Sequence, residues 1–460
     1  MPTNPLPDRL GTPTEVGTMN ASIRSAETAS VLSRGDVAVR KYGGSSLATA
    51  ERVANVAEAI ATSHRDNGPL VIVVSAQGDA TDHLLSVAQQ VGGGPTERET
   101  DQLLATGECA SAALLAMALQ ARGTPAVSLA GWQAGIQVIG PPGKAVIASI
   151  DTSRITSLLA AGVSVVIAGF QGVDQHGDLL TLGRGGSDTT AVALTIALDA
   201  QRCEIYTDVD GVFSADPRLV SDARLLPTVE VSVMAEMAFA GARVMHSRAV
   251  ELAAMNSVDF YVRNSLQPRS GTLVTAEDDP HALETRGVVI GVTQDVDVAR
   301  VLVQAVAAGS DLAAEVLAIL AEHSVPVDLV ARSGPYETEF RMGFTIRCGD
   351  LSETGHLLAE RVRARGGTLQ VDAEVAKVSL VGMGLLNRPQ YTARVLTVLS
   401  AAGISSSWIS TSQLRTSVVV PRARVGEAVH LLHHEFGLDR PAATSAVRSG
   451  SHRRPAPAAS

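Results

Sequence analysis

The sequence of 460 residues predicts an α/β protein in which a mainly parallel sheet flanked by helices is followed by two smaller α+β modules. Two observations lead to this fold class. Between about 36 and 275, short β-branched runs alternate with alanine-rich amphipathic stretches, the pattern of βα units around a parallel sheet. From about 285 to 440, a strand–helix–strand pattern occurs twice. The apolar share of 45% is enough to build the cores that this arrangement needs.

Five short apolar runs predict strands of the main sheet: Val37–Tyr42, Leu70–Val74, Val163–Gly169, Cys203–Thr207 and Val258–Val262. Thr49–Ile60 places Val53, Val56 and Ile60 at helical spacing, and Thr190–Leu198 is similarly apolar and helix-prone. Each of these two segments follows a predicted strand through a turn that contains glycine. The order of elements is therefore that of repeated βα units.

The second part of the chain contains two weakly similar units. The predicted strand, helix and strand are Val298–Val303, Leu312–Glu322 and Val327–Val330 in the first unit, and Ala376–Val381, Thr392–Ala401 and Ile404–Ser410 in the second. Such repeated small units resemble the ligand-binding regulatory modules called ACT domains, which have a βαββαβ order. The acidic segment 276–284, which contains a proline, is interpreted as the linker before the pair.

Composition limits the classes of function. The segment 1–35 is rich in Pro, Thr and Ser, and 441–460 has almost nothing to bury, so we expect a disordered leader and a disordered tail. A net charge of −10 gives no sequence-wide attraction to nucleic acid or to anionic membranes, and neither is expected as a partner. Three scattered cysteines fit a reducing cytoplasm and predict neither a disulfide framework nor a cysteine-based zinc site.

The first chemically informative segment is Lys41–Ser46, which reads Lys-Tyr-Gly-Gly-Ser-Ser between a predicted strand and a predicted helix. Gly43 and Gly44 let backbone N–H groups approach an anion, and the helix N-terminus adds partial positive charge. Lys41 supplies a full charge at the same place. An ordinary glycine turn is the alternative for this segment taken alone.

A second glycine cluster changes that balance. Gly183–Asp188 reads Gly-Arg-Gly-Gly-Ser-Asp and again lies between a strand and a helix. The guanidinium of Arg184 offers a planar fork suited to a carboxylate, and the flanking glycines leave room for a small ligand. A third segment, Tyr206–Arg218, leaves a strand through three carboxylates, a Gly, a Pro and an Arg, and loops in this position hold nucleotides in α/β proteins.

Together these segments resemble the aspartokinases of the amino-acid kinase family. The resemblance spans nearly the whole predicted folded chain and is carried in order by Lys41–Ser46, Ser75–Asp79, Thr106–Glu108, Gly169–Gly172, Gly183–Asp188, Thr207–Phe213 and Ser410–Ser412. It implies the amino-acid kinase fold over 36–275 and paired ACT domains over 285–440. It also implies transfer of the γ-phosphoryl group of ATP, with Mg²⁺, to the side-chain carboxylate of L-aspartate.

Roles for individual residues follow from the same resemblance. Lys41 and Asp188 are expected to be catalytic, with Lys41, Gly43 and Gly44 on the phosphates. The aspartate side is expected to be lined by Ser45, Ser75, Glu108, Arg184 and Ser187. The nucleotide side is expected to comprise Thr207, Asp208, Phe213, Asp216, Arg218 and Arg243, where Arg243 replaces a lysine of many relatives. No residue is assigned as a metal ligand, because Mg²⁺ is expected to bridge phosphate oxygens.

Three further expectations concern alternatives, effectors and histidines. A related amino-acid kinase acting on another carboxylate and a catalytically dead ACT regulatory protein remain alternative functions.

The pair of modules is expected to form a homo-oligomer and to bind an amino-acid effector weakly, because the stretches around Asp311 and Arg332 depart from the effector pocket of relatives. His430, His433 and His434 have helical spacing and are predicted to form a solvated helix face.

Overall fold

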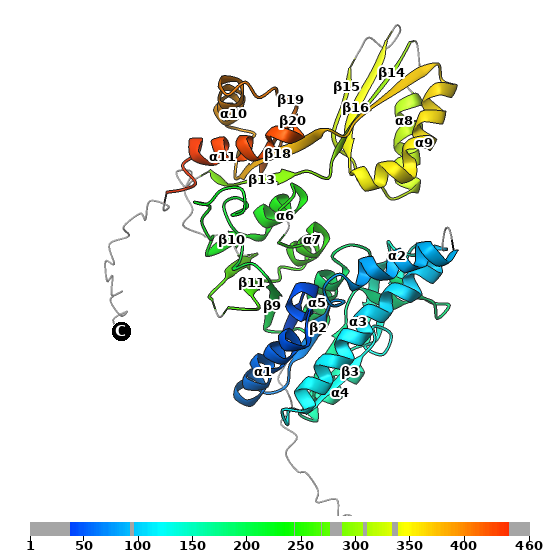
Figure 1. The fold of residues 1–460 in the computed structure, drawn as a ribbon, viewed down its shortest axis with the longest axis vertical. Helices are drawn as coiled ribbons and strands as arrows, with labels where there is room; N and C mark the ends of the chain where they lie inside the picture. The colour runs from blue at the N-terminus through cyan, green and yellow to red at the C-terminus, as the bar shows by residue number, and fades with distance from the viewer. Residues whose placement is uncertain are drawn as a thin grey trace, which may run out of the picture. The chain divides into compact units, whose positions relative to one another are not determined.

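The computed structural model describes residues 37–92, 96–242, 244–267, 269–276, 288–306, 311–333 and 339–440. The expected leader over 1–35 and the expected tail over 441–460 lie outside the described residues, as does the expected linker except for Ala276. Figure 1 shows the described elements and labels many of them with the numbering used below.

Eight strands form the main sheet in the order β10-β12-β11-β9-β1-β2-β6-β3. Their bounds are Ala38–Tyr42 (β1), Val71–Val74 (β2), Ala126–Leu129 (β3), Ser164–Ala168 (β6), Arg202–Thr207 (β9), Thr228–Glu230 (β10), Phe260–Asn264 (β11) and Thr272–Thr275 (β12). Neighbours in this sheet run parallel except β11 and β12. The predicted fold class is confirmed, and the five predicted strands are present with ends displaced by at most two residues.

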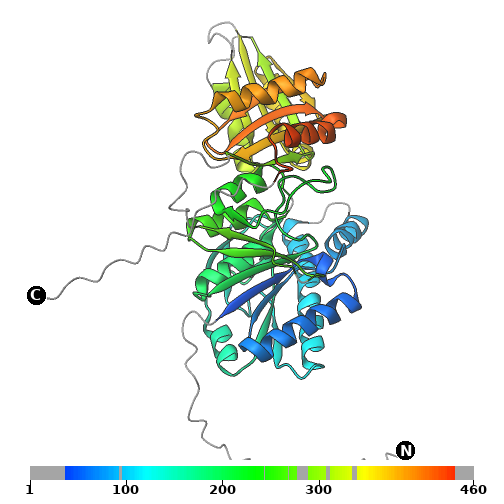
Figure 2. The ribbon, with the colours of Figure 1, turned by 90° about the vertical axis from the view of Figure 1, so that its left-hand side faces the viewer.

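Helices cover both faces of this sheet (Figure 2). On one face, α1 (Ala50–Asn67) and α3 (Glu97–Gln120) pack over the side chains of Ile72 and Val74. On the other face, Val71 and Val73 pack in a core that includes side chains of four further helices: α4 (Ser153–Ala160), α5 (Gly186–Ala197), α6 (Val231–Phe239) and α7 (Ser247–Met255). Because successive side chains of a strand point to opposite faces, one apolar run supplies both cores.

The predicted helix after the first strand extends further than its apolar pattern. Helix α1 begins after Thr49, whose Oγ1 accepts a hydrogen bond from the backbone N–H of Arg52 at 3.2 Å. It ends at Asn67, and the next residue, Gly68, has a φ of +83° that favours glycine. The start of α1 is thus set by a side-chain cap, and its end is set by a glycine in the left-handed backbone region.

Helix α3 is long and apolar enough, by length and composition, to cross a membrane, and it is the one such helix among the residues that the structure describes. Its Leu115 and Leu119 are fully buried in the core beneath the sheet. Asp101 of the same helix is also buried and accepts hydrogen bonds from the backbone N–H groups of Gly143 and Thr181 at 2.8 and 2.7 Å. These contacts are those of a core helix in a globular domain.

A second sheet that sequence analysis does not predict lies after β3. It has the order β5-β4-β7-β8, with bounds Ile136–Ile139 (β4), Val146–Ile150 (β5), Gln171–Val173 (β7) and Leu179–Thr181 (β8). Helix α2 (Ala80–Gly92) precedes α3. These strands have three to five residues, too short for a reliable period-two pattern.

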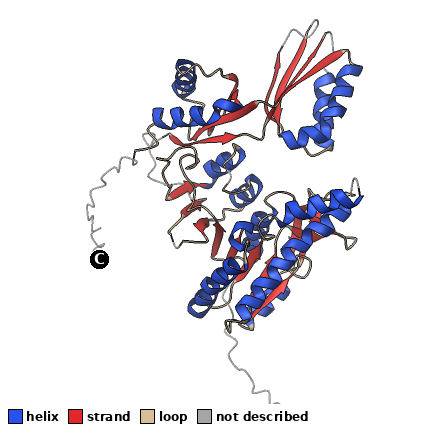
Figure 3. Cartoon of the chain, in the orientation of Figure 1, coloured by secondary structure: helices blue, strands red, loops and turns tan. Residues whose placement is uncertain are grey.

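The described residues after β12 form two four-stranded sheets, each with two helices (Figure 3). The first small module comprises β14 (Ala299–Ala305), α8 (Asp311–Glu322), β15 (Asp328–Ser333), β16 (Phe340–Ile346), α9 (Cys348–Ala364) and β17 (Gly367–Asp372). The second small module comprises β13 (Val289–Asp295), β18 (Val375–Gly382), α10 (Pro389–Ala401), β19 (Ser407–Thr411), β20 (Arg415–Pro421) and α11 (Val425–Glu435). The second sheet has the order β13-β18-β20-β19. Strand β13 therefore completes the second module although it precedes the first in sequence.

The prediction of a solvated histidine face on α11 is wrong for one of its three residues. His430 and His434 are exposed, but His433 is 1% exposed. The Nε2 atom of His433 lies 2.9 Å from the hydroxyl oxygen of Ser214, a residue of the loop after β9. This side of α11 packs on that loop, so the histidine is a buried hydrogen-bonding group.

Candidate active site

The first glycine loop follows β1 at the edge of the sheet where neighbouring parallel strands also end. The backbone N–H of Gly43 donates to the carbonyl oxygen of Tyr206 in β9 at 3.2 Å. A Cβ atom at Gly44 would lie 2.5 Å from the carbonyl oxygen of Ala76, so only glycine fits between the two loops. The carboxyl ends of β1, β2 and β9 are thereby held together, as ligand sites in open α/β sheets require.

Lys41 and Asp188 meet at this edge. The Nζ atom of Lys41 lies 2.6 Å from Asp188 Oδ1, and the two side chains are 12% and 11% exposed. This contact is an ion pair that is not aligned as a hydrogen bond. Asp188 lies in the first turn of α5. This helix begins directly after Gly185, whose φ is +71°. The two residues expected to be catalytic are therefore brought together from segments about 150 residues apart.

Glu108 lies next to the loop that follows β2. Its Oε1 accepts a hydrogen bond from the backbone N–H of Ala76 at 3.1 Å, whereas its buried Oε2 has no hydrogen-bond partner. Burial raises the pKa of Glu108 to about 7, and the bond from Ala76 offsets only part of this effect. A buried carboxylate oxygen without a partner is suited to receive a cationic group of a ligand.

The remaining predicted substrate residues are distributed around the same edge. Ser75 follows β2, and Ser187 is 6% exposed in the first turn of α5. Ser187 packs so closely on Gly169 that a Cβ there would lie 2.8 Å from its hydroxyl oxygen. Ser45 is half-buried, and its carbonyl oxygen accepts a hydrogen bond from Arg52 at 2.5 Å. Arg184 is exposed between its glycines.

A pocket of about 450 Å³ lies beside the third predicted segment. It is lined by Asp208, Phe213, Asp216 and Arg218 from the loop after β9, by Met237 of α6, by Gly241, Ala242 and Val244, and by Val292, Thr293 and Gln294 of β13. The structure thus brings four of the predicted nucleotide residues into one cavity. Thr207, Lys41, Gly43 and Gly44 are not among its lining residues, and Arg243 lies outside the described residues.

The loop that lines this pocket is fixed by its own charges. Asp216 accepts hydrogen bonds from the guanidinium of Arg218, Nε to Oδ1 at 3.0 Å and Nη2 to Oδ2 at 2.8 Å. Gln294 also donates to Asp216 Oδ2, at 3.2 Å. Hydrogen bonding from Arg218 lowers the pKa of Asp216. The side chain of Arg218 remains 75% exposed, so its charge is accessible to an anionic ligand.

His246 is a residue of the site that was not predicted from the sequence. His246 lies behind the second glycine loop, where a Cβ at Gly185 would be 2.1 Å from the His246 Cβ. Its Nδ1 is buried without a hydrogen-bond partner. Burial, then the nearby charge of Arg347, lowers its pKa, so the ring is neutral at pH 7. The sequence gives little indication of a role for His246. It lies two residues after Val244, and its neighbours in space come from other segments.

The site has few side chains that could hold a metal ion. The described residues contain no group of three or more His, Cys, Asp or Glu side chains placed to bind one. Asp208 is nevertheless an exposed carboxylate on the pocket wall. Mg²⁺ in kinases is held by one or two carboxylates together with substrate phosphates and water, so this donor set fits Mg²⁺ carried by a nucleotide.

Comparisons with known proteins decide the family. Residues 36–264 match the amino acid kinase family, and residues 378–436 match an ACT domain. The chain is 41% identical to the aspartokinase of Geobacillus stearothermophilus over 413 residues, which is 90% of this chain and all of that protein. The chain belongs to the aspartokinase family. It is 42% identical to the aspartokinase of Mycolicibacterium smegmatis over 406 residues, which cover 87% of this chain and 96% of that one.

The fold agrees with a solved aspartokinase. E. coli aspartokinase III, solved in complex with aspartate and ADP, superposes with a TM-score of 0.73 at 24% identity, covering 87% of this chain and 99% of that chain. At this identity the likeness concerns the fold. The expected family and fold class are confirmed, whereas the roles of individual site residues remain predictions.

Proposed function

We propose that this chain transfers the γ-phosphoryl group of ATP to the side-chain carboxylate of L-aspartate and forms 4-phospho-L-aspartate. The family supports the reaction, because full-length relatives near 40% identity are aspartokinases. The observation that carries the assignment to this site is the Lys41–Asp188 ion pair, which lies at the same sheet edge as the partnerless oxygen of Glu108. The site accordingly offers a cation for a phosphoryl group and an anion for an ammonium group.

The reaction needs positioning and charge neutralisation more than proton transfer. A free aspartate carboxylate ionises near pH 4, so the nucleophile is already anionic at neutral pH. Lys41 stabilises the charge that spreads over the transferring phosphoryl oxygens, and Gly44 donates its backbone N–H group. The N–H of Gly43, expected to do the same, is instead bonded to the carbonyl oxygen of Tyr206 and holds the loop in place. Asp188 holds Lys41 in place. It is not needed as a general base, because the acceptor carboxylate of aspartate carries no proton to remove. Bound Mg²⁺ would neutralise phosphate charge, with Asp208 as the available carboxylate.

Arg184 is proposed to bind the α-carboxylate of aspartate. Its exposed guanidinium lies next to the first turn of α5, and a bidentate pair with a carboxylate is a strong and directional contact. We expect Arg184→Ala to raise KM for aspartate by about 10- to 100-fold and to change kcat much less, because the contact is made equally in the ground state and the transition state. Steady-state kinetics with varied aspartate measure this split. A fall in kcat at unchanged KM would assign Arg184 to the phosphoryl side instead.

Glu108 is proposed to bind the ammonium group of aspartate, which makes binding dependent on pH. Its pKa of about 7 means that the carboxylate is largely protonated below pH 7 and ionised above it. We therefore expect KM for aspartate to fall as pH rises from 6 to 8, with the change centred near pH 7. Glu108→Gln should raise KM and remove this pH dependence. An unchanged pH profile in that variant would show that another group controls it.

The same pKa has the opposite consequence for stability. Because folding raises the pKa of Glu108, its contribution to stability is present below the pKa of an unfolded glutamate, near 4.3, and is lost as pH rises through about 7. Binding of an ammonium group would reverse this loss. Thermal unfolding at pH 8 should accordingly respond more strongly to aspartate than thermal unfolding at pH 6.

The small modules are proposed to assemble the enzyme and to respond weakly to amino acids. The guanidinium of Arg332 on β15 lies 5.1 Å above the ring of Phe340, and an arginine cannot accept a hydrogen bond from an ammonium group. Residues 307–310, 334 and 335, where the sequence also departs from relatives, lie outside the described residues. We expect about 0.3 mM threonine plus lysine to leave most activity intact, and abolition at that level would require sub-millimolar binding.

The alternatives are tested by substrate preference. ADP formation is measured with L-aspartate, L-glutamate and N-acetyl-L-glutamate, each with ATP and Mg²⁺. Preference for L-aspartate is expected, whereas preference for another carboxylate would support a related amino-acid kinase. Absence of substrate-dependent ADP formation would support a catalytically dead regulatory protein. A cytoplasmic location is proposed as well, and the three free cysteines are consistent with a reducing compartment.

A further inference from the structure

Helix α6 lies between the pocket and the second small module. Met237 of this helix lines the pocket of about 450 Å³, as do Gly241 and Ala242 in the turn that follows the helix. Glu236 and Phe239 of the same helix contact the second small module. Any displacement of α6 relative to that module would therefore move part of the pocket wall.

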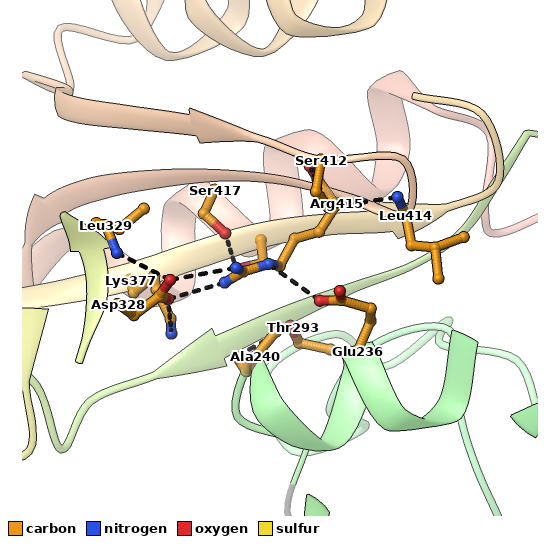
Figure 4. Close-up of polar contacts among 11 residues, drawn as sticks. Glu236, Ala240, Thr293, Asp328, Leu329, Lys377, Ser412, Leu414, Arg415 and Ser417 are labelled. Atoms are coloured by element: carbon orange, nitrogen blue, oxygen red, sulfur yellow. Dashed lines mark hydrogen bonds and ion pairs between the residues drawn. The ribbon is translucent and has the colours of Figure 1, made fainter. Parts of the chain in front are cut away.

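Arg415, the first residue of β20, reaches α6 from the second small module (Figure 4). Lys377 of β18 also reaches it, with its Nζ atom 5.1 Å from the centre of the Phe239 ring. Its Nη1 and Nη2 donate to Oδ2 and Oδ1 of Asp328 at 2.9 and 3.2 Å, which is a bidentate contact with the first small module. Its Nε lies 3.1 Å from Glu236 Oε2 of α6. Arg415 is 10% exposed and stacks at 5.1 Å over the ring of Phe239.

Arg415 is not needed simply to neutralise Asp328. The Nζ atom of Lys377, which is 3% exposed, also lies 2.9 Å from Asp328 Oδ2 (Figure 4). Although burial opposes ionisation, the hydrogen bond from Arg415 and the charge of Lys377 hold the pKa of Asp328 well below its usual range. The cluster therefore contains two acidic and two basic side chains, and its charges balance. Arg415 is the member that bonds Asp328 and also pairs with Glu236.

Strand β13 of the same sheet contacts the end of α6 independently. The hydroxyl of Thr293 donates to the carbonyl oxygen of Ala240 at 3.1 Å. A Cβ at Gly241 would lie 2.2 Å from the carbonyl oxygen of Gln294, so the two backbones touch. Thr293 and Gln294 are themselves part of the pocket wall. Two strands of one sheet thus hold the segment 236–241, and β13 continues into the pocket.

We propose that Arg415 is a positioning residue for nucleotide binding, which fixes α6 through Glu236 and thereby sets the wall formed by Met237, Gly241 and Ala242. This rests on the proposed assignment of the pocket to ATP. Arg415 acts through α6 and does not line the pocket. Glu108, on the aspartate side, is bonded to Ala76, and among the residues that the structure describes no hydrogen bond or ion pair joins it to this cluster, so we expect the effect to be specific to the nucleotide.

The test is a kinetic comparison of Arg415→Ala with wild-type enzyme. We expect KM for ATP to rise about five- to tenfold, while kcat and KM for aspartate stay within about twofold, because a partly buried ion pair is lost without loss of a transition-state contact. Glu236→Gln should raise KM for ATP by about threefold, since it keeps the shape of the side chain. The double variant should be no worse than Arg415→Ala alone, which would demonstrate coupling of the pair. Arg415→Lys should give an intermediate KM, because an ammonium group cannot contact both acids.

The control is Arg424→Ala in the same module. Arg424 pairs with Glu427 at 2.7 Å on the surface and does not contact α6. We expect wild-type kinetics from this variant. Equal KM values for ATP in Arg415→Ala and Arg424→Ala, or an equal rise in both substrate KM values, would overturn the proposal.

Two further readouts keep the result interpretable. Thermal unfolding identifies a variant that fails to fold, in which case Glu236→Gln and Arg415→Lys carry the test, with unchanged KM for ATP in both contradicting it. Wild-type activity with aspartate tests the proposed function separately. Wild-type activity together with unchanged nucleotide KM in the variants would overturn the role of Arg415 and leave the proposed function intact.

Discussion

Replacing Lys41 by alanine is expected to lower kcat by about 10²–10³-fold, the usual cost of removing a group that stabilises transition-state charge. Lys41 Nζ is held 2.6 Å from Asp188 Oδ1 in a site where both side chains are nearly buried. In such surroundings a positive charge is screened little by water and acts strongly on developing phosphoryl charge. KM for aspartate should change little, because Arg184 and Glu108 are proposed to carry that contact.

Two further variants, Asp188→Asn and Arg202→Ala, separate an effect on catalysis from an effect on folding. Asp188→Asn should also lower kcat, because Lys41 loses the carboxylate that orients it. Lys41→Ala leaves the Asp188 carboxylate without its cation, so part of its effect will appear as a lower melting temperature. Arg202→Ala removes a basic side chain from another part of the same sheet and should retain wild-type kcat. A Lys41 variant with near-normal turnover and normal stability would remove Lys41 from the mechanism.

Gly44→Ala is expected to lower kcat/KM by about 100-fold, because an added methyl group would displace the loop that carries the proposed phosphate contacts. The new Cβ would lie 2.5 Å from the carbonyl oxygen of Ala76 and 3.3 Å from that of Gly78, both backbone atoms. The N–H of Gly78 also donates to the carbonyl oxygen of Gly44 at 3.0 Å. Pushing the loop after β1 away from the loop after β2 would therefore also strain this bond. The same movement would disturb Glu108, which is bonded to Ala76.

The neighbouring glycine provides the matched comparison. A Cβ at Gly43 would lie 3.6 Å from Lys41 Nζ and 3.8 Å from Tyr206 O, which are ordinary contacts. Gly43→Ala should therefore cost much less than Gly44→Ala in both kcat/KM and melting temperature. Equal effects from the two substitutions would indicate that the close approach of the loops does not determine activity.

Five of the eight strands of the main sheet were predictable from their β-branched apolar runs, whereas β3, β10 and β12 were not predicted. The clearest of these runs are β2 and β6, which are buried along their whole length. Val71–Val74 contains four buried residues in a row, which no exposed strand would show. The small sheet was not predictable, because strands such as Gln171–Val173 are too short to carry a periodic pattern. The position of β13 was not predictable either, because its pairing with β18 depends on a contact across about 90 residues.

The candidate site divides in the same way. Lys41, Arg184 and Asp188 lie in glycine-rich motifs whose local chemistry is visible in the sequence. His246 and Gln294 have ordinary neighbours in sequence and acquire their surroundings only through folding. His433 was predicted to be solvated from its spacing alone, but the loop that carries Ser214 covers it. The surroundings of these residues outside the motifs are thus set by tertiary packing, which the sequence alone does not show.

The most direct test of the account is identification of the product trapped by hydroxylamine. The enzyme is incubated with ATP, Mg²⁺, L-aspartate and hydroxylamine, and the hydroxamate is analysed by mass spectrometry and NMR. Formation of aspartate β-hydroxamate, in amounts equal to ADP and abolished in Lys41→Ala, is the result that we predict. ADP formed without a β-hydroxamate, or a hydroxamate from the α-carboxylate or from another amino acid, would contradict the assignment of L-aspartate to this site.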